Sequence, residues 1–496
     1  MGWSAGSPEA TIPTRQPDRE ADLEAQITVQ ATLIAELGAA NAELAKQVEV
    51  LQARVAELER RLGQNSQNSS RPPSSDGLAK PPTPQRERRE GRRPGKQPGA
   101  PGAHLAQVAH PDQVVIHRPA TCQRCGGDLT VAPVVATEAR QVFDLPATRL
   151  RVVEHRAEHR QCGCGQATQA AFPAQATAPA CYGPGMRALG VYLLVSQHLP
   201  VERAAGLLAE VVGAPCSAGW LQRLPTEAAG ALDGFGAQAR RVLAGAEVVH
   251  VDETGARVGG RLHWVHVAAT PWWTWLTVHP KRGVKATDAA GVLPCFQGVA
   301  VHDFWSPYWR YPKATHAVCA AHLLRELDAA AAQPGQTWAG ELAEWLTIAI
   351  GITTKARTAG ADHLDPAIVE VLLDCYDQII ATGHAANPPP PPRPGRRPKR
   401  SKAACLLERL DAHRDEVCRF LQDLRVPPTN NQAERDLRMV KLQQKISGCW
   451  RTLTGAQAFL LVRSYLATAR KHGRNALMVL RQLFEGAAWL PTTSPA

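Results

Sequence analysis

The sequence has no long hydrophobic run. Within its 496 residues, no apolar stretch approaches the ~18 residues that a membrane-spanning helix needs. The first residues, MGWSAGSPEATIPTRQ, also lack the basic and then apolar layout of a secretory signal. We therefore expect a soluble protein of the cytoplasm, with no membrane partner. Apolar residues make up 44% of the chain, which is enough to fill the cores of roughly three domains.

Little of the chain carries a strong charge of one sign. Residues 86–96 and 393–402 have net charges of +4 and +6, so they hold +10 of the formal +11. The remainder is close to neutral. Basic runs of this kind are either solvated linkers or contacts for a phosphate backbone. The candidate DNA contacts in these two segments are Arg92, Arg93, Arg396 and Arg397.

Disulfides are not expected, because a cytoplasmic chain keeps its cysteines reduced. Two close pairs, CQRC and CGC, are then better explained as metal ligands. Four thiolates can close a tetrahedral Zn²⁺ site, and the neighbouring glycines permit the tight turns that such sites use. His155 and His159 are possible substitutes, and free buried cysteines are the alternative. The expected ligands are Cys122, Cys125, Cys162 and Cys164.

Residues 21–63 show the clearest periodicity. Apolar residues recur every 3.5 residues over five heptads, which predicts a parallel two-stranded coiled coil and hence a homodimer. A single amphipathic helix packed on its own domain is the alternative. The a and d positions are Ile27, Gln30, Ile34, Leu37, Asn41, Leu44, Val48, Leu51, Val55, Leu58 and Leu62.

Residues 184–228 have a helical pattern. The segment VERAAGLLAEVVGAPCSAGWLQRL predicts one amphipathic helix, a turn at 213–215, and a second helix capped by Ser217. Such a unit could place its second helix in a major groove. That helix offers Gln222 and Arg223 as obvious contacts, so a plain helical hairpin is an equal alternative.

From residue 246 the pattern becomes extended. Three short strands are expected at 247–254, 261–270 and 272–280, followed by strands at 298–304 and 315–321 that alternate with helices. This order is typical of the mixed sheet of a ribonuclease H-like fold. Asp252 and Asp303 each end a strand and would face each other, which suggests a Mg²⁺ site, although an acid at a strand end can also be simple turn chemistry.

A third carboxylate is needed to hold two ions for phosphoryl transfer. Glu434 is the best candidate, since residues 428–431 form a helix start and place it in the first turns. Lys441 lies nearly two turns further, on the same face. Lys441 and Arg438 are therefore candidate DNA contacts on this helix.

These motifs together resemble the bacterial insertion-sequence-66 transposases of the DDE superfamily. The resemblance covers most of the chain, through the segments LGQNSQNSSRPPSSDGLAK, YGPGMRALGVYLL, HVDETGARV, CAAHLLREL and NNQAERDLRMVKLQQK and the two cysteine pairs. It implies that Asp252, Asp303 and Glu434 bind two Mg²⁺ or Mn²⁺ ions as the catalytic triad. Cys319 and His322 match a C-x-x-H signature of several DDE groups, for which a structural role is expected.

The resemblance also implies an activity and partners. The enzyme would cut at the ends of its own mobile element and join the freed 3′-OH to target DNA, at the nucleoid and with accessory proteins of the same element. Two alternatives remain: a non-catalytic DNA-binding protein with an inactive nuclease-like fold, and a nuclease that never joins strands. Intact acids at all three positions argue against the first.

The expected fold class is multidomain α+β, with a ribonuclease H-like mixed-sheet catalytic domain that carries a helical insertion. The expected segments are a disordered N-terminus (1–20), a coiled coil (21–63), a disordered basic linker (64–115), a zinc module (116–170), a helical DNA-binding region (180–240), the catalytic domain (245–480) with its insertion (about 325–425), and a C-terminal tail (481–496).

Overall fold

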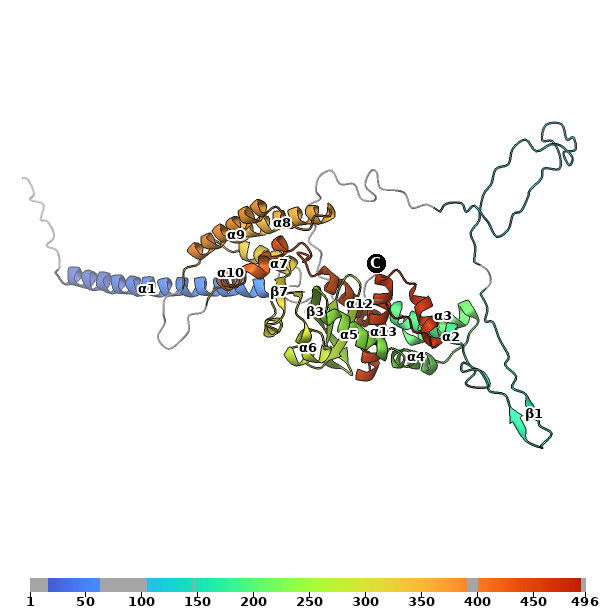
Figure 1. The fold of residues 1–496 in the computed structure, drawn as a ribbon. Coiled ribbons are helices and arrows are strands. Elements are labelled where there is room, and N and C mark those ends of the chain that lie inside the picture. Colours follow the sequence, from blue (N-terminus) through green and yellow to red (C-terminus); the bar gives the residue numbers. More distant parts are fainter. Residues whose placement is uncertain (1–16, 63–104, 146–147, 390–399, 492–496) are drawn as a thin grey trace, which may run out of the picture. The chain divides into compact units, whose positions relative to one another are not determined.

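The computed structural model describes residues 17–62, 105–145, 148–389 and 400–491 (Figure 1). Contacts divide the chain into two units, Met1–Arg71 and Pro72–Ala496. None of the helices in the described ranges is both long enough and apolar enough to cross a membrane. Most of the linker expected at 64–115 and the four candidate arginines Arg92, Arg93, Arg396 and Arg397 lie outside these ranges.

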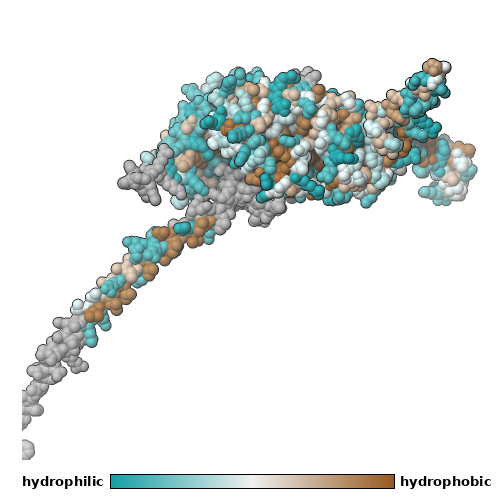
Figure 2. Space-filling view, turned by 90° about the horizontal axis from the view of Figure 1, so that it is seen from below, coloured by the Kyte–Doolittle hydropathy of each residue, from teal (hydrophilic) through white to brown (hydrophobic). Residues whose placement is uncertain are grey.

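The first unit is built on one helix, α1 (Pro17–Leu62), which begins four residues before the expected boundary. Six residues of its seam are exposed, and brown surface runs along the helix in Figure 2. These residues form an apolar stripe along the surface of the helix. The exposed members of the seam are Leu37, Leu44, Val48, Leu51, Val55 and Leu58.

The second unit starts with two small hairpins and continues into helices. One hairpin is marked by a bridge between Thr121 and Asp128, and the other pairs β1 (His159–Gln161) with β2 (Ala167–Gln169). The helices that follow are α2 (Pro184–Val191), the π-helical turn η2 (Tyr192–Ser196), α3 (Val201–Val212), α4 (Ala218–Gly230) and α5 (Asp233–Ala244).

The turn between α3 and α4 forms as the sequence predicts. Gly213 ends α3 with a φ of 66°, a conformation that costs glycine little. The Ser217 hydroxyl accepts the Trp220 N–H at 3.2 Å and caps α4, so the predicted cap is confirmed. Gln222 and Arg223 are both exposed on α4.

A mixed five-stranded sheet forms the centre of the second unit, and its order is β5-β4-β3-β6-β7. The first three strands along the chain are an antiparallel meander, and β6 and β7 run parallel to β3. The expectation of a meander followed by alternating strands and helices is confirmed. The strands are β3 (Val248–Val258), β4 (Arg261–Ala269), β5 (Thr274–His279), β6 (Val299–His302) and β7 (Thr315–Val318).

β3 is longer than predicted, so Asp252 does not end it. The strand continues to Val258 and pairs with β4 along this length, through a turn at Gly259 and Gly260. Both glycines have positive φ, of 55° and 75°, which suits a two-residue hairpin turn. What ends near Asp252 is the pairing of β3 with β6, whose last paired residue on β3 is His250.

Helices from the C-terminal part of the chain pack on the sheet. α12 (Asn431–Ser447) contacts β3 and β4, α13 (Leu453–Lys471) contacts β5, and α6 (Val284–Ala290) contacts β4 and β5. α14 (Ala476–Phe484) packs against α2 and α4 and extends past the expected start of the tail at 481. One hydrophobic core therefore joins the helical region to the sheet.

The insertion has a hydrophobic core of its own, which includes Trp338, Leu346, Tyr376 and Leu410. Its last helix is tied to the sheet, because Arg419 Nε donates to the carbonyl of His316 on β7 at 2.7 Å. The insertion thus folds as a helical layer beyond the edge strand β7. Its helices are α7 (Ala320–Ala331), α8 (Thr337–Thr358), α9 (Pro366–Ala386), α10 (Lys402–Ala412) and α11 (Arg414–Gln422).

Candidate active site

Asp252 and Asp303 come together where β3 and β6 part. The parallel register pairs Val248 with Val299 and His250 with Val301. Two residues further, the same register sets Asp252 beside Asp303, which directly follows β6. β3 stays paired with β4 beyond this point, so the two aspartates lie where only the pairing between β3 and β6 has ended.

The pKa of each aspartate is raised. Burial raises the pKa of Asp252 well above its ordinary value, and the charges of Glu253, Asp303 and Glu434 raise it further. Burial also raises the pKa of Asp303. Like charges in a site that is partly shielded from water oppose ionisation. Ionised carboxylates here therefore destabilise the fold at neutral pH unless a cation is bound beside them.

Glu434 reaches this site from the first turn of α12. Its position depends on Asn430, which is 1% exposed. The Asn430 amide donates to the carbonyl of Val251 at 2.8 Å, and its oxygen pairs with His250 Nδ1 at 3.0 Å. Asn430 therefore fastens the start of α12 to β3 just before Asp252. The sequence predicted residues 428–431 only as a helix start and missed this role.

The three carboxylates do not gather around a single point. Among the described residues, Asp252, Asp303 and Glu434 do not form a group compact enough to surround one ion. Burial raises the pKa of Glu434, while Arg325 and Arg438 lower it. Asp252 feels the charge of both other acids, so it is the middle member of the set.

Glu253, next to Asp252, is a buried acid with its own counter-charge. Arg282 donates to Glu253 Oε1 through Nε at 2.8 Å and Nη2 at 2.6 Å, and the Tyr308 hydroxyl donates to the other oxygen. Burial, followed by the charge of Asp303, raises the pKa of Glu253 to about 7 in spite of Arg282. Glu253 is not among the site residues predicted from the sequence, and nothing in the local pattern points to Arg282.

Arg282 is itself held between two indole rings. Its guanidinium lies 4.1 Å from the ring centre of Trp305 and 4.8 Å from that of Trp264. Trp305 follows Asp303 by two residues and donates its backbone N–H to that carboxylate at 3.0 Å. The stack thus fixes a cation and the loop after β6 together, close to Asp303.

A second ion pair holds α12 against the sheet. Asp436 on α12 lies 2.9 Å from Lys471 Nζ on α13 and accepts the Thr274 hydroxyl of β5 at 2.8 Å. Lys471 also donates to the carbonyl of Trp273 at 2.9 Å. These bonds explain why α12 keeps its register beside β3 and β4.

The predicted DNA contacts on α12 have different surroundings. Lys441 Nζ donates to the carbonyl of Gly255 on β3 at 2.7 Å, and burial lowers its pKa to about 8. Arg438 is exposed. Lys441 is thus engaged with the backbone of the strand that carries Asp252, whereas Arg438 is accessible.

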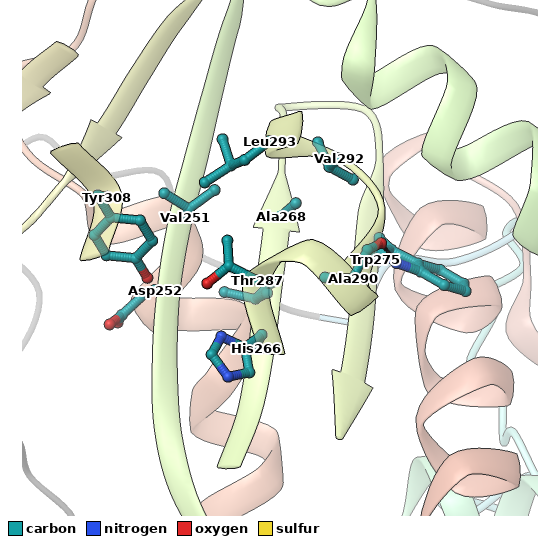
Figure 3. A pocket seen from close by; sticks show the side chains of 11 residues that line it. Val251, Asp252, His266, Ala268, Trp275, Thr287, Ala290, Val292, Leu293 and Tyr308 are labelled. Carbon is teal, nitrogen blue, oxygen red and sulfur yellow. Dashed lines mark hydrogen bonds between the residues drawn. The ribbon is translucent and has the colours of Figure 1, made fainter. Parts of the chain in front are cut away.

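A small cavity of about 20 Å³ lies beside Asp252, between the sheet and α6 (Figure 3). Figure 3 shows the carboxylate of Asp252 close to the Tyr308 hydroxyl, with His266 below. His266 Nε2 is buried and has no hydrogen-bond partner in the protein. The space is large enough for about one water molecule, which could hydrate this imidazole.

Each predicted zinc-binding pair forms a tight turn. Gly126 N–H donates to the carbonyl of Cys122 at 2.8 Å, and Gly165 N–H donates to that of Cys162 at 2.9 Å. Hydrogen bonds from the backbone, then from the partner thiols Cys125 and Cys164, lower the pKa of Cys122 and of Cys162. In the described ranges the two pairs are not assembled into one four-sulfur cluster, so the zinc site stays a prediction.

Comparison with known families gives two matches. The Transposase IS66 family model matches residues 179–458, which is more than half of the chain. A family of unknown function (DUF6444) matches residues 13–106. No curated protein matches. The first match includes the sheet, the insertion and all three carboxylates, and the chain accordingly belongs to the IS66 family of transposases.

Proposed function

We propose that this transposase cleaves DNA at the ends of its mobile element and joins the freed 3′-OH to target DNA. Asp252, Asp303 and Glu434 would be its catalytic residues. The observation that carries the proposal is their convergence from β3, from the end of β6 and from α12, with Asp252 in the field of both others. An acid set of this kind is the usual protein contribution to phosphoryl transfer.

The residues fit two divalent ions, Mg²⁺ or Mn²⁺. Oxygen ligands suit these hard cations, and the mutual repulsion of the acids is relieved when a cation lies among them. Asp252 would contribute to both ions, and Asp303 and Glu434 to one each. Ions bound there would activate the attacking oxygen and stabilise the leaving one.

The other residues of the site act through position. Asn430 sets the distance between α12 and β3, and the Asp436–Lys471 pair fixes the helix on the sheet. Arg282, stacked between Trp264 and Trp305, would hold the loop that carries Asp303. The acids must be ionised to bind a cation, so Asp252 would release its proton as the site fills.

The strand order supports a ribonuclease H-like catalytic domain. A three-stranded meander followed by two strands parallel to the first is the order expected for that fold. The helical insertion then lies between the second and third catalytic acids, as α7 to α11. In this arrangement the first and fourth strands of the sheet are neighbours, which is what brings Asp252 to Asp303.

Strand-transfer assays on single substitutions test the proposal. Asp252→Asn, Asp303→Asn and Glu434→Gln should each reduce 3′-end joining in Mg²⁺ by about 100-fold or more. Asp328→Asn, an exposed acid on α7, is the matched control and should retain activity. Undiminished joining by any of the three variants would remove that residue from the catalytic set.

Product analysis separates the remaining alternatives. A transposase yields joined strands, a nuclease yields nicks alone, and a DNA-binding protein without activity yields neither. A gel that separates joined strands, nicked strands and uncut DNA therefore distinguishes all three functions for the wild-type chain. Joined products that require Mg²⁺ or Mn²⁺ would support the proposal.

We further propose that α1 dimerises as a parallel coiled coil, which would bring two element ends together. The support is the exposed seam, which a second copy would cover. Leu51→Lys should weaken dimerisation by about 100-fold, because it buries a charge at a d position. Sedimentation of the full chain measures this effect.

Val50→Lys is the control for that substitution. Val50 is also exposed, at 67%, but it lies outside the a and d positions. It should leave the dimer intact. Equal dimer stability of the Leu51 and Val50 variants would contradict the seam as the interface. The zinc module and the α3–α4 unit would add DNA recognition, with Gln222 and Arg223 as exposed contacts.

A further inference from the structure

A thiol and an imidazole lie beside Glu434, and the proposed DNA chemistry uses neither. Cys319 follows β7 and is the residue before α7, and His322 lies in the first turn of that helix. The Cys319 sulfur, a His322 ring nitrogen and a Glu434 carboxylate oxygen lie within 4.8 Å of one another. Within the part of the chain that the structure describes, this is the only group of three such side chains spaced for one ion.

Two of these atoms are buried acceptors that face each other. His322 Nδ1 and Glu434 Oε1 are 3.7 Å apart, and neither takes part in a hydrogen bond within the protein. Arg325 Nη2 lies 4.0 Å from the same Glu434 oxygen, which is beyond hydrogen-bond distance. A buried polar atom without a partner is costly, and a shared cation would satisfy both.

The third atom, the Cys319 sulfur, is surrounded by backbone donors. Asn430 N–H donates to it at 3.1 Å, and the backbone N–H groups of Ala321 and His322 also favour its thiolate. Cys319 is fully buried, and burial raises its pKa to about 11. The backbone N–H groups thus favour the thiolate form of Cys319, and a cation beside the sulfur would offset the remaining cost of burying its negative charge.

We propose that Cys319, His322 and Glu434 form a binding site for a thiophilic divalent cation, and that Zn²⁺ is the ion that fits. Ligands of one tetrahedral Zn²⁺ lie about 3.3–3.6 Å apart, so a contraction of about 1.5 Å or less closes the set, whose atoms now lie within 4.8 Å of one another. Thiolate and imidazole select Zn²⁺ over Mg²⁺. Three protein ligands leave one position for water or another ligand.

The site shares Glu434 with the catalytic set. An ion held by Cys319 and His322 would keep this carboxylate from the ions at Asp252 and Asp303. Zn²⁺ would then act as an inhibitor of strand transfer in competition with Mg²⁺, a consequence that rests on the proposed function. The binding site itself does not depend on that function.

Co²⁺ and Zn²⁺ binding to the purified full-length chain tests the site without any activity measurement. The wild type is compared with His322→Gln, Glu434→Gln and Cys319→Ser by metal analysis and by Co²⁺ absorption spectroscopy. Each variant should bind about one ion fewer per chain and lose the part of the tetrahedral Co²⁺ absorption that this site contributes, with a drop in thiolate charge-transfer intensity in Cys319→Ser. Cys418→Ser, a second fully buried cysteine of the same helical layer, should match the wild type.

The comparison with His322→Gln covers the risk that a buried Cys319→Ser substitution fails to fold. Equal ion content and equal spectra for the wild type and His322→Gln would overturn the proposal. The predicted four-cysteine site contributes equally to all of these chains, so it cancels in the differences. Loss of joining activity in Glu434→Gln with unchanged Co²⁺ binding would support the catalytic role and reject this site.

Discussion

Asp252 and Glu253 are neighbours on β3, but their surroundings differ. Glu253 has a side chain that is 1% exposed and an Arg282 partner at 2.6 Å. Asp252 accepts the Glu253 N–H at 2.8 Å, while Glu253, Asp303 and Glu434 all raise its pKa. One acid therefore has a cation from the chain itself, and the other lies among like charges.

The difference indicates which acid serves the fold and which serves the chemistry. A buried carboxylate with a built-in arginine is compensated before any ligand arrives. An acid whose pKa is raised by burial and by neighbouring carboxylates destabilises the fold until a cation binds, and such sites are often functional. The comparison supports a positioning role for Glu253 and Arg282, and it supports the proposed ion-binding role of Asp252.

Removal of Arg282 should have the largest effect on stability. Arg282→Ala leaves Glu253 buried without its partner and should lower the free energy of unfolding by about 3 kcal/mol at pH 9, where Glu253 of the wild type is ionised. Urea denaturation measures the change. The effect should shrink at low pH, because Glu253, with a pKa of about 7, is then protonated and needs no counter-charge.

Arg257→Ala is the control on the same hairpin. Arg257 is exposed and donates to the carbonyl of Gly260 at 2.9 Å. Its removal should change stability by no more than about 0.5 kcal/mol. If both substitutions had equally small effects, the view of Glu253 and Arg282 as a structural pair would fail.

Asp252→Asn should have the opposite sign. Without divalent ions, the variant should be more stable than the wild type by about 1–2 kcal/mol at pH 7, since one of the repelling charges is gone. An acid whose folded pKa is raised penalises the fold as pH rises above its ordinary value of 3.8. The advantage of the variant should therefore be absent near pH 3 and grow toward neutral pH.

Mg²⁺ should reverse that advantage. The wild type should gain stability with added Mg²⁺, more so at higher pH, because its acids must be ionised to bind. Asp252→Asn should gain less. Thermal unfolding of the wild type and of Asp252→Asn, each with and without Mg²⁺ at two pH values, measures these gains in stability. Identical shifts in both chains would mean that Asp252 is not an ion ligand.

The sequence points to the three proposed catalytic acids more directly than to the residues that hold them in place. Asp252 and Asp303 are recognisable because each follows an apolar run, and Glu434 because it starts a helix. The length of β3 was missed, since GARVGG has the composition of a turn and forms a strand only by pairing with β4. The local sequence pattern predicts that a strand forms here, but pairing with β4 determines where β3 ends.

The residues that hold the site could not be predicted, because their partners are remote in sequence. Asn430 contacts His250 and Val251, which are 180 and 179 positions away. Glu253 points to the opposite face of the strand from Asp252, and the charge that compensates its burial comes from Arg282, 29 residues further along the chain. Periodicity shows which side chains are buried, but it does not show which of the charged side chains form ion pairs with one another.

Lys441 offers the smallest and sharpest test of the comparison. It is a cation on α12, near the acids, but it donates to the carbonyl of Gly255 at 2.7 Å rather than to a carboxylate. Lys441→Met should therefore lower the free energy of unfolding by only about 1 kcal/mol at pH 7, and Lys445→Met, at an exposed position, by less than about 0.5 kcal/mol.

The folded pKa of Lys441 is about 8 and its ordinary value is 10.5, so the penalty on its charged form is relieved as pH rises. The stability difference between the wild type and Lys441→Met should thus widen from pH 8 toward pH 10.5. A stability advantage of Asp252→Asn that no longer changes with pH in a Lys441→Met background would instead make Lys441 the counter-charge of Asp252. The contrast with Glu253 would then be lost.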